Sequence, residues 1–195
     1  METSSPVEQD RGTLLDVAEL SLVHFLKTKR EIGIDPLVFP PPLQQHRATF
    51  VTLRRGEHLR GCMGTLIPRM PLVQDVAHNA YASACHDPRF SPLTADEFPG
   101  LHIQISLLTL PEPIEFNSED ELLARIHPGI DGLILTHGHR RGTLLPSVWN
   151  MCPDKREFME HLKQKAGLPK DFWDDDIRIE RYRSISWSRT VPETH

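Results

Sequence analysis

The chain has 195 residues, a net charge of −5 and 38% hydrophobic residues, a composition typical of globular rather than disordered proteins. Its length suits one medium-sized domain or two small lobes that share a core. No run of Lys or Arg exceeds two residues. The charge pattern therefore excludes the basic footprint of a protein that binds nucleic acid or an anionic membrane.

Other features of the composition bear on location and cofactors. No apolar stretch approaches the roughly 20 residues of a transmembrane helix, and the N-terminus lacks the basic and apolar regions of a secretory signal. The three cysteines, Cys62, Cys85 and Cys152, are widely spaced and form neither a disulfide framework nor a zinc pattern. We expect a cytoplasmic protein without a structural metal or a cofactor.

The first half of the chain predicts alternating helices and strands. Residues 1–12 indicate a loose tail, and Thr13, with Asp16 three residues later, predicts a capped helix that runs to about Arg30. Prolines between 36 and 42 favour an extended loop. Residues 48–53 alternate as a strand, and a second strand is expected to lead through Leu59 into a turn at Cys62.

The second half continues in the same mixed order. A helix follows Pro71 with a face of small residues, a short helix lies near Asp96, and residues 101–110 form a strand. Ser118 and Asp154 each predict a helix N-cap, and the latter helix ends at Gly167. Residues 132–136 and 142–145 predict a hairpin around Gly138, and 177–188 a final strand.

These elements show no regular βαβ repeat, which indicates an α+β fold with mainly antiparallel sheets and flanking helices. The small-residue face of the helix after Pro71 is expected to pack closely on a sheet; it comprises Val73, Val76, Ala77, Ala80 and Ala84. We expect one domain over residues 13–190, with two lobes that meet near 111–118.

The segment Leu59-Arg-Gly-Cys-Met-Gly64 carries the most chemical information. Gly61 and Gly64 permit unusual backbone angles and close approach of another group. Arg60 would favour the thiolate of Cys62, the form that attacks electrophiles. The alternative is a tight turn whose cysteine is merely buried.

A second candidate segment is Asp87-Pro-Arg-Phe90. Asp87 caps a turn or pairs with an arginine, and Phe90 anchors the loop in the core. If Arg89 lies beside Arg60, the two guanidinium groups make an anion site; if each pairs with an internal carboxylate, they only hold their loops.

Two histidine arrangements compete with simpler explanations. His86 follows Cys85 and would act as a base for Cys62 if the fold brought them together. His137 and His139 would bind zinc with a third ligand, but Gly138 between them favours a hairpin tip with two solvated histidines. We therefore expect no metal-binding residues.

Several motifs in order resemble the AMMECR family over nearly all of residues 13–187. They are Leu59-Arg-Gly-Cys-Met-Gly-Thr65, Pro71-Leu-Val-Gln-Asp-Val-Ala-His-Asn-Ala80, Asp87-Pro-Arg-Phe-Ser-Pro-Leu93, Ile105-Ser-Leu-Leu108, Pro128-Gly-Ile-Asp-Gly-Leu-Ile134, Leu145-Pro146, Lys165-Ala-Gly-Leu168 and Arg181-Tyr182. The prokaryotic type is called AmmeMemoRadiSam system protein A. Gln104 and Ser147 depart from the residues that relatives often carry there.

The resemblance implies a two-lobed α+β domain and, through neighbouring genes, a Memo-type protein and a radical-SAM protein as partners. It supplies no reaction, so two functions stay open. In the first, Cys62 is catalytic and acts on a small or peptide-borne anionic substrate. The residues that bind this substrate would be Arg60, Gly61, Gly64, Asp87 and Arg89. In the second, the glycine-rich segment is the recognition surface of a non-catalytic binding or adaptor module.

Overall fold

The computed structural model describes residues 10–193. The chain divides into two compact units, one comprising the residues up to Leu108 and from Ile185 onward, the other Thr109–Ser184. Each unit contains a four-stranded sheet with helices against it, and the strand pairs with a defined register are antiparallel. The α+β class is confirmed. The expected meeting point of the lobes, 111–118, falls inside the second unit.

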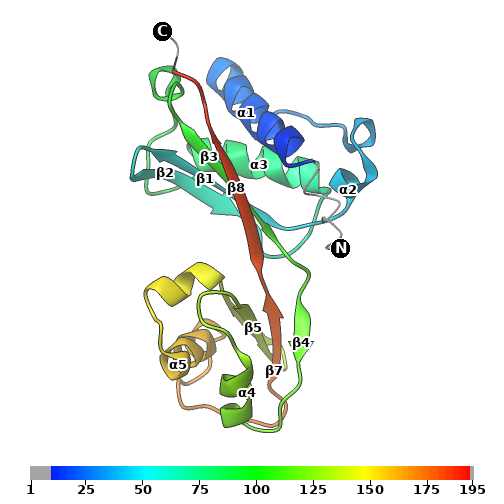
Figure 1. Ribbon diagram of the computed structural model, residues 1–195, viewed down its shortest axis with the longest axis vertical. Helices are drawn as coiled ribbons and strands as arrows, with labels where there is room; N and C mark the ends of the chain where they lie inside the picture. Colours follow the sequence, from blue (N-terminus) through cyan, green and yellow to red (C-terminus); the bar gives the residue numbers. More distant parts are fainter. Residues whose placement is uncertain (1–9, 194–195) are drawn as a thin grey trace, which may run out of the picture. The chain divides into compact units, whose positions relative to one another are not determined.

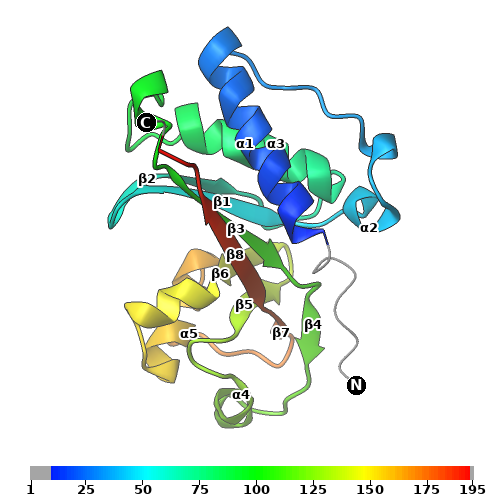
Figure 2. The same cartoon turned by 45° about the horizontal axis from the view of Figure 1, so that its top comes forward.

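In the first unit, two helices lie on one face of a sheet with the strand order β2-β1-β3-β8 (Figure 2). The strands are β1 (Thr49–Arg55), β2 (His58–Gly64), β3 (His102–Leu108) and β8 (Ser184–Thr190). The helices are α1 (Arg11–Thr28) and α3 (Leu72–Cys85). Helix α3 contacts both β1 and β2, so it is the element that bears on the Cys62 segment.

The core of the first unit follows from the alternation of β1 and the small face of α3. Val51 and Leu53 are fully buried on the helix-covered face of the sheet. The predicted small-residue face of α3 is buried against them: Val73, Val76, Ala77, Ala80 and Ala84. Alanine side chains allow the helix axis to lie close to the strands, so polar side chains of α3 can reach the strand backbones.

The second unit has the strand order β4-β7-β5-β6 (Figure 1). Its strands are β4 (Glu112–Ile114), β5 (Gly132–His137), β6 (Arg140–Leu144) and β7 (Arg178–Tyr182). Its helices are α4 (Glu119–Arg125) and α5 (Lys155–Lys165). Phe158 of α5 stacks on Trp149 with ring centroids 3.7 Å apart. This unit is held mainly by apolar and aromatic packing.

Local sequence signals placed several helix ends correctly. The Ser118 side chain accepts a hydrogen bond from Glu121 N, and Asp154 accepts from Arg156 N and Glu157 N. The short helix near Asp96 is the 3₁₀ turn η2 (Ala95–Glu97). The predicted hairpin around Gly138 is confirmed as β5 and β6.

The first helix and the proline-rich loop differ from expectation. Helix α1 begins at Arg11, so Thr13 lies within it and does not cap it, and Asp10 takes the N-cap position without a side-chain bond. Residues 1–9 of the expected tail lie outside the described residues. The expected extended loop over 36–42 contains two short turns, η1 (Pro36–Val38) and α2 (Pro41–Gln44), because proline fits the first position of a helical turn.

Two strand predictions were wrong. Cys62 is not in a turn: it lies within β2, which continues to Gly64. The turn between β1 and β2 is at Arg55-Gly56, as the sequence predicts, with a φ of 54° at Gly56. The final strand is two strands, β7 and β8, which belong to different sheets. They separate at Arg183. Its N–H donates to Thr109 Oγ1 and its carbonyl oxygen accepts from Thr109 N, each at 2.8 Å. These pairings join distant segments and leave no mark in the local alternation.

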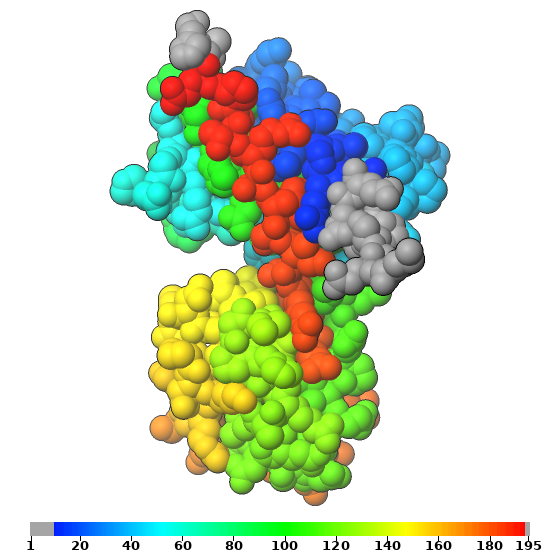
Figure 3. Space-filling view, in the orientation of Figure 1, coloured from blue at the N-terminus to red at the C-terminus, as the bar shows by residue number. Residues whose placement is uncertain are grey.

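Strand β8 lies at the surface of the first unit, beside the start of α1 (Figure 3). Trp187 Nε1 donates to Arg11 O at 3.2 Å, and Arg189 pairs with Asp16. These contacts tie the last strand to the first helix. Between residues 10 and 193, none of the helices combines the length and the apolar character needed to cross a bilayer.

Candidate functional site

Cys62 lies on the face of the first sheet opposite the helices. It pairs with Thr52 of β1, and Thr52 pairs with Gln104 of β3. The three half-buried side chains therefore form a polar row across the sheet. Cys62 Sγ is 3.2 Å from Thr52 Oγ1, and either atom is able to donate. The sequence did not indicate Thr52, because its contact depends on strand register.

Asp87 joins Cys62 to Arg89. Asp87 Oδ2 accepts a hydrogen bond from Cys62 N at 2.9 Å. The same carboxylate accepts from Arg89 Nε at 2.9 Å and from Arg89 Nη2 at 2.7 Å. The Arg89 guanidinium holds the pKa of Asp87 well below its usual range. One buried carboxylate thus fixes both the thiol-bearing strand and a guanidinium whose side chain is 54% exposed.

Arg60 is held by a different carboxylate. Its Nε donates to Glu97 Oε1 at 2.7 Å and its Nη2 to Glu97 Oε2 at 2.9 Å. These bonds lower the pKa of Glu97 to about 2. Glu97 also accepts from Thr94 N and Oγ1 in a capping box. The spacing Thr94-x-x-Glu97 was a readable cap signal, but its partnership with Arg60 was not.

The two arginines share an aromatic neighbour. The guanidinium carbons of Arg60 and Arg89 lie 5.9 and 5.5 Å from the ring centroid of Phe90. Phe90 is half-buried and lies near both guanidinium groups, so it is not the fully buried anchor that the sequence suggested. The expected proximity of the arginines is present, while each also faces an internal carboxylate. Anion binding by the pair stays a prediction.

Gly61 and Gly64 are required by close contacts rather than by turn geometry. A Cβ on Gly61 would lie 2.0 Å from the carbonyl oxygen of Ser83 in α3. A Cβ on Gly64 would lie 2.3 Å from Cγ of Phe50. Neither glycine has a positive φ. They let β2 approach α3 and β1, and a direct contact of either with substrate stays a prediction.

Four buried polar side chains, spaced four residues apart, run along and just beyond α3. This polar stripe comprises Asp75, Asn79, Ser83 and Asp87. Asp75 Oδ2 accepts from Thr49 N at 2.8 Å and from Thr49 Oγ1 at 2.6 Å. Asn79 Nδ2 donates to Thr49 O at 3.1 Å. The first two members of the stripe therefore hold the start of β1.

The other members of the polar stripe hold the Cys62 segment. Ser83 Oγ donates to Val51 O at 2.7 Å and accepts from Met63 N at 2.9 Å. Asp87 then takes the N–H of Cys62. Ser83 thus bridges the paired residues Val51 of β1 and Met63 of β2, and Asp87 satisfies a backbone N–H of the edge strand β2. Sequence analysis missed the stripe, although its spacing of four among alanines was a visible helical signal.

Among the residues that the structure describes, Asp75 has no cationic side chain in direct contact, whereas Asp87 is paired with Arg89. Burial raises the pKa of Asp75, while hydrogen bonds from Thr49 and Thr65 oppose that rise. Thr65 Oγ1 donates to Asp75 Oδ1 at 2.8 Å. The carboxylate is thus satisfied by neutral donors, which suits a structural rather than a catalytic group.

The other two thiols are in less favourable settings. Cys85 Sγ bonds the carbonyl of Tyr81 at 3.3 Å, and burial raises its pKa. Burial likewise raises the pKa of Cys152. His86 is exposed and makes its edge-to-face ring contact with Tyr81 at 5.0 Å. The structure therefore does not join His86 to Cys62.

The histidines of the second hairpin have ordinary surroundings. His137 Nε2 is 3.7 Å from Asp174 Oδ1, and its ring meets Phe172 edge-on. His139 is exposed. Across residues 10–193, no three His, Cys, Asp or Glu side chains gather closely enough to hold a metal ion.

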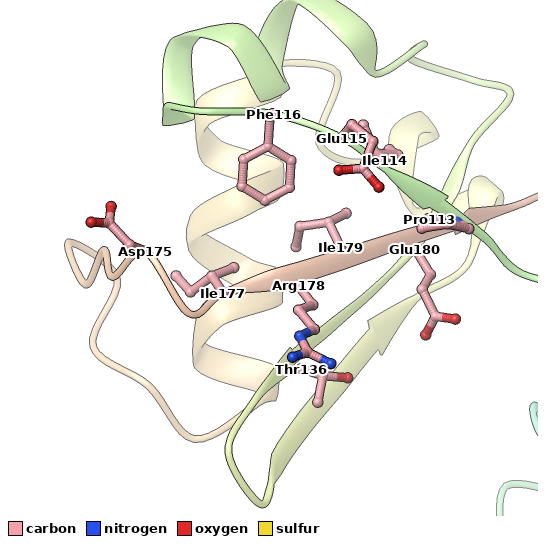
Figure 4. A pocket seen from close by; sticks show the side chains of 10 residues that line it. All are labelled: Pro113, Ile114, Glu115, Phe116, Thr136, Asp175, Ile177, Arg178, Ile179 and Glu180. Carbon is pink, nitrogen blue, oxygen red and sulfur yellow. The ribbon is translucent and has the colours of Figure 1, made fainter.

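A separate cavity of about 560 Å³ lies in the second unit along β4 and β7 (Figure 4). Phe116 lies on one side with Ile177 and Ile179, and Arg178 extends toward Thr136 on the other. None of the predicted site residues lines this cavity. It therefore adds nothing to the hypothesis built on Cys62.

Comparison with known proteins covers both units. A family model described as AMMECR1 matches residues 15–187. A protein from Methanothermobacter thermautotrophicus is 36% identical over 185 residues, which cover 92% of this chain and 95% of the relative. Protein PH0010 from Pyrococcus horikoshii is 37% identical over 188 residues, covering 92% and 89%. The crystal structure of PH0010, an uncharacterized protein, superposes with a TM-score of 0.75 at 36% identity, covering 92% and 91%.

Proposed function

The chain belongs to the AMMECR1 family, and we propose that its Cys62 is a nucleophile toward a small or peptide-borne anionic substrate. The observation that carries the proposal is the shared carboxylate: Asp87 bonds both the N–H of Cys62 and the guanidinium of Arg89. The backbone that carries the thiol and an exposed cation are thereby held by one buried carboxylate. An anionic substrate bound by Arg89 would lie beside the sulfur.

The surroundings of the thiol support this assignment. Thr52 Oγ1 is able to donate to the sulfur and so to stabilise the thiolate. Cys85 and Cys152 have pKa values raised by burial and are poorer nucleophiles at neutral pH. Arg60 adds positive charge near Phe90, although its bidentate bond to Glu97 makes it a supporting rather than a primary contact.

We also propose the wider setting that the family resemblance implies. The protein would work in the cytoplasm with a Memo-type protein and a radical-SAM protein. The described residues contain no group of cysteines suited to an iron–sulfur cluster. Radical chemistry would therefore reside in the partner, and this chain would supply Cys62 and the arginines.

Brief alkylation of the native protein tests the nucleophile directly. Iodoacetamide reacts as the thiolate displaces iodide, forming a C–S bond while the thiol proton goes to solvent. We expect mass spectrometry to find Cys62 labelled well before Cys85 and Cys152. Labelling of either other cysteine while Cys62 stays unmodified would overturn the proposal.

A charged reagent tests the role of Arg89. If Arg89 attracts anions to Cys62, iodoacetate gains in rate relative to neutral iodoacetamide. Arg89→Gln should lower that rate ratio several-fold, because it removes the positive charge. Arg55→Gln, at an exposed position of the β1–β2 hairpin that carries Cys62, is the control and should leave the ratio unchanged. Equal effects of the two variants would remove Arg89 from the site.

One observation favours the second function, a non-catalytic binding module. Arg60 and Arg89 each make a bidentate bond to an internal carboxylate, and Thr52 Oγ1 is the one hydrogen-bond partner of Cys62 Sγ within residues 10–193. A module of this kind needs a rigid strand but no reactive thiol. Inertness of Cys62 toward iodoacetamide until the protein unfolds would select it.

A further inference from the structure

A buried carboxylate in the second unit contacts two partly exposed basic side chains. Asp131, which precedes β5, is fully buried. Its Oδ2 accepts from His127 N at 2.9 Å and from His127 Nδ1 at 3.0 Å. Its Oδ1 lies 3.5 Å from Arg183 Nε and has no hydrogen-bond partner among the described residues. Asp131 therefore faces both side chains at once.

These contacts determine how His127 and Arg183 present their remaining nitrogens. Because a carboxylate only accepts, Nδ1 of His127 carries the proton in this bond and Nε2 lies on the far side of the ring. Arg183 turns Nε toward Asp131, which leaves both Nη atoms free to act as a fork. The side chains of His127 and Arg183 are 54% and 53% exposed. Within residues 10–193, neither Nε2 nor the Nη atoms have a hydrogen-bond partner.

A loop lock explains only part of this arrangement. The bond from His127 N to Asp131 Oδ2, with the backbone bonds of Ile130 N and Asp131 N to His127 O, already closes the loop. Neither the imidazole bond nor the buried, unsatisfied Oδ1 beside Arg183 is needed for that closure. A buried carboxylate oxygen that faces a guanidinium at 3.5 Å without a hydrogen bond is costly, which is consistent with a functional rather than a packing role.

We propose that His127 and Arg183, oriented by Asp131, bind a phosphate group. The Arg183 fork matches two phosphate oxygens. Neutral His127 Nε2 is an acceptor and pairs with the P–OH of a monohydrogen phosphate. This site uses residues of the second unit alone and is independent of the role proposed for Cys62. Asp131 belongs to the segment Pro128-Gly-Ile-Asp-Gly132, to which the Cys62 proposal assigns no role.

Discrimination between phosphate and sulfate tests the chemistry of the site. The two ions have the same shape, but sulfate carries no proton to give to Nε2. At about pH 8, where inorganic phosphate is mainly the monohydrogen ion, it should shift the NMR signals of the His127 ring saturably in the millimolar range. Sulfate should bind about tenfold more weakly. Phosphoserine, titrated in parallel, has a second phosphate pKa of about 6, so at this pH it carries no P–OH. It should therefore bind as weakly as sulfate, which would identify free phosphate rather than a phosphate monoester as the ligand.

Matched variants locate the binding. His127→Gln and Arg183→Gln should each weaken phosphate binding about tenfold, the loss of one charge-assisted contact. His139→Gln and Arg181→Gln, in the same unit, should leave binding unchanged. The indole N–H of Trp149, which donates to Asp131 O at 2.7 Å, reports in every variant that the loop is intact.

Three results would overturn the proposal. The first is the absence of any saturable shift of His127 with inorganic phosphate. The second is sulfate binding as tight as phosphate binding. The third is equal weakening by the test and control variants while the Trp149 signal stays in place. None of these results depends on the reactivity of Cys62.

Discussion

The two helices that cover the two sheets do so by different means. Helix α3 presents the polar stripe to its sheet, and the stripe bonds the backbones of β1 and β2. Helix α5 presents apolar side chains, of which Phe158 stacks on Trp149. Its buried Lys163 pairs with Glu119 of α4 rather than with a strand. Apolar packing is non-directional, whereas hydrogen bonds fix individual strands.

The comparison shows which backbone groups each unit holds in place by directional contacts. In the second unit, apolar packing holds α5 against the sheet, and Arg140 of β6 donates a hydrogen bond to Gly167 O just after the helix. In the first unit, Ser83 and Asp87 take the N–H groups of Met63 and Cys62 on an edge strand. The strand that carries the candidate nucleophile thus receives directional support, as does its neighbour β1.

The largest loss of stability is expected from a substitution in the second unit. Phe158→Ala removes a fully buried ring from a stack and should lower the free energy of unfolding by about 3–5 kcal/mol. Under conditions where the variant stays folded, the rate of Cys62 alkylation should not change. Urea unfolding and iodoacetamide kinetics measure the two quantities. A changed rate of Cys62 alkylation in the folded variant would show that the apolar core of the second unit affects the strand that carries Cys62.

Gly61→Ala should destabilise the first unit almost as strongly. Its Cβ would lie 2.0 Å from Ser83 O, a backbone atom that cannot turn away. We expect a loss of about 3 kcal/mol together with a changed Cys62 alkylation rate. Gly33→Ala is the control, because its Cβ would meet nothing within 4 Å. Equal unfolding midpoints for the two variants would contradict the close approach of β2 to α3.

A smaller effect should appear in acid. Arg60 lowers the pKa of Glu97 to about 2. The contribution of the Glu97 carboxylate to the free energy of unfolding is therefore fully present above the ordinary pKa of about 4.3 and is lost as pH falls through about 2. Glu97→Gln should destabilise the protein by about 1–2 kcal/mol at neutral pH, after allowance for screening. That difference should shrink toward zero near pH 2.

Unfolding of Glu97→Gln at several pH values checks this expectation, with Glu57→Gln at the exposed hairpin tip as control. A stability difference from the parent that stays constant with pH would mean that the ion pair with Arg60 does not stabilise the folded state.

The sequence predicted features whose cause is local. The caps at Ser118 and Asp154, the small face of α3 and the hairpin around Gly138 each depend on residues within a few positions of one another. The placement of Cys62 in a turn failed because β2 continues through close contacts with α3, which lies twenty residues away. Likewise, the split between β7 and β8 depends on pairing with Thr109.

The same division holds for the candidate site. The pairing of Asp87 with Arg89, two residues apart, was one of the sequence-based alternatives. The partners Thr52 and Glu97 come from other elements and required the strand register and the loop path. The His127–Asp131 contact is local, but a histidine four residues before an aspartate carries no distinctive signal.

Backbone amide hydrogen exchange at Cys62 and Met63 tests most directly the claim that side chains of the polar stripe hold the thiol-bearing strand. In the parent protein both amides should exchange slowly, because Asp87 and Ser83 accept their protons at 2.9 Å. Asp87→Asn should accelerate exchange at Cys62, and Ser83→Ala at Met63, while Leu133 in β5 stays protected. Fast exchange of both amides in the parent, or no change in either variant, would contradict the account.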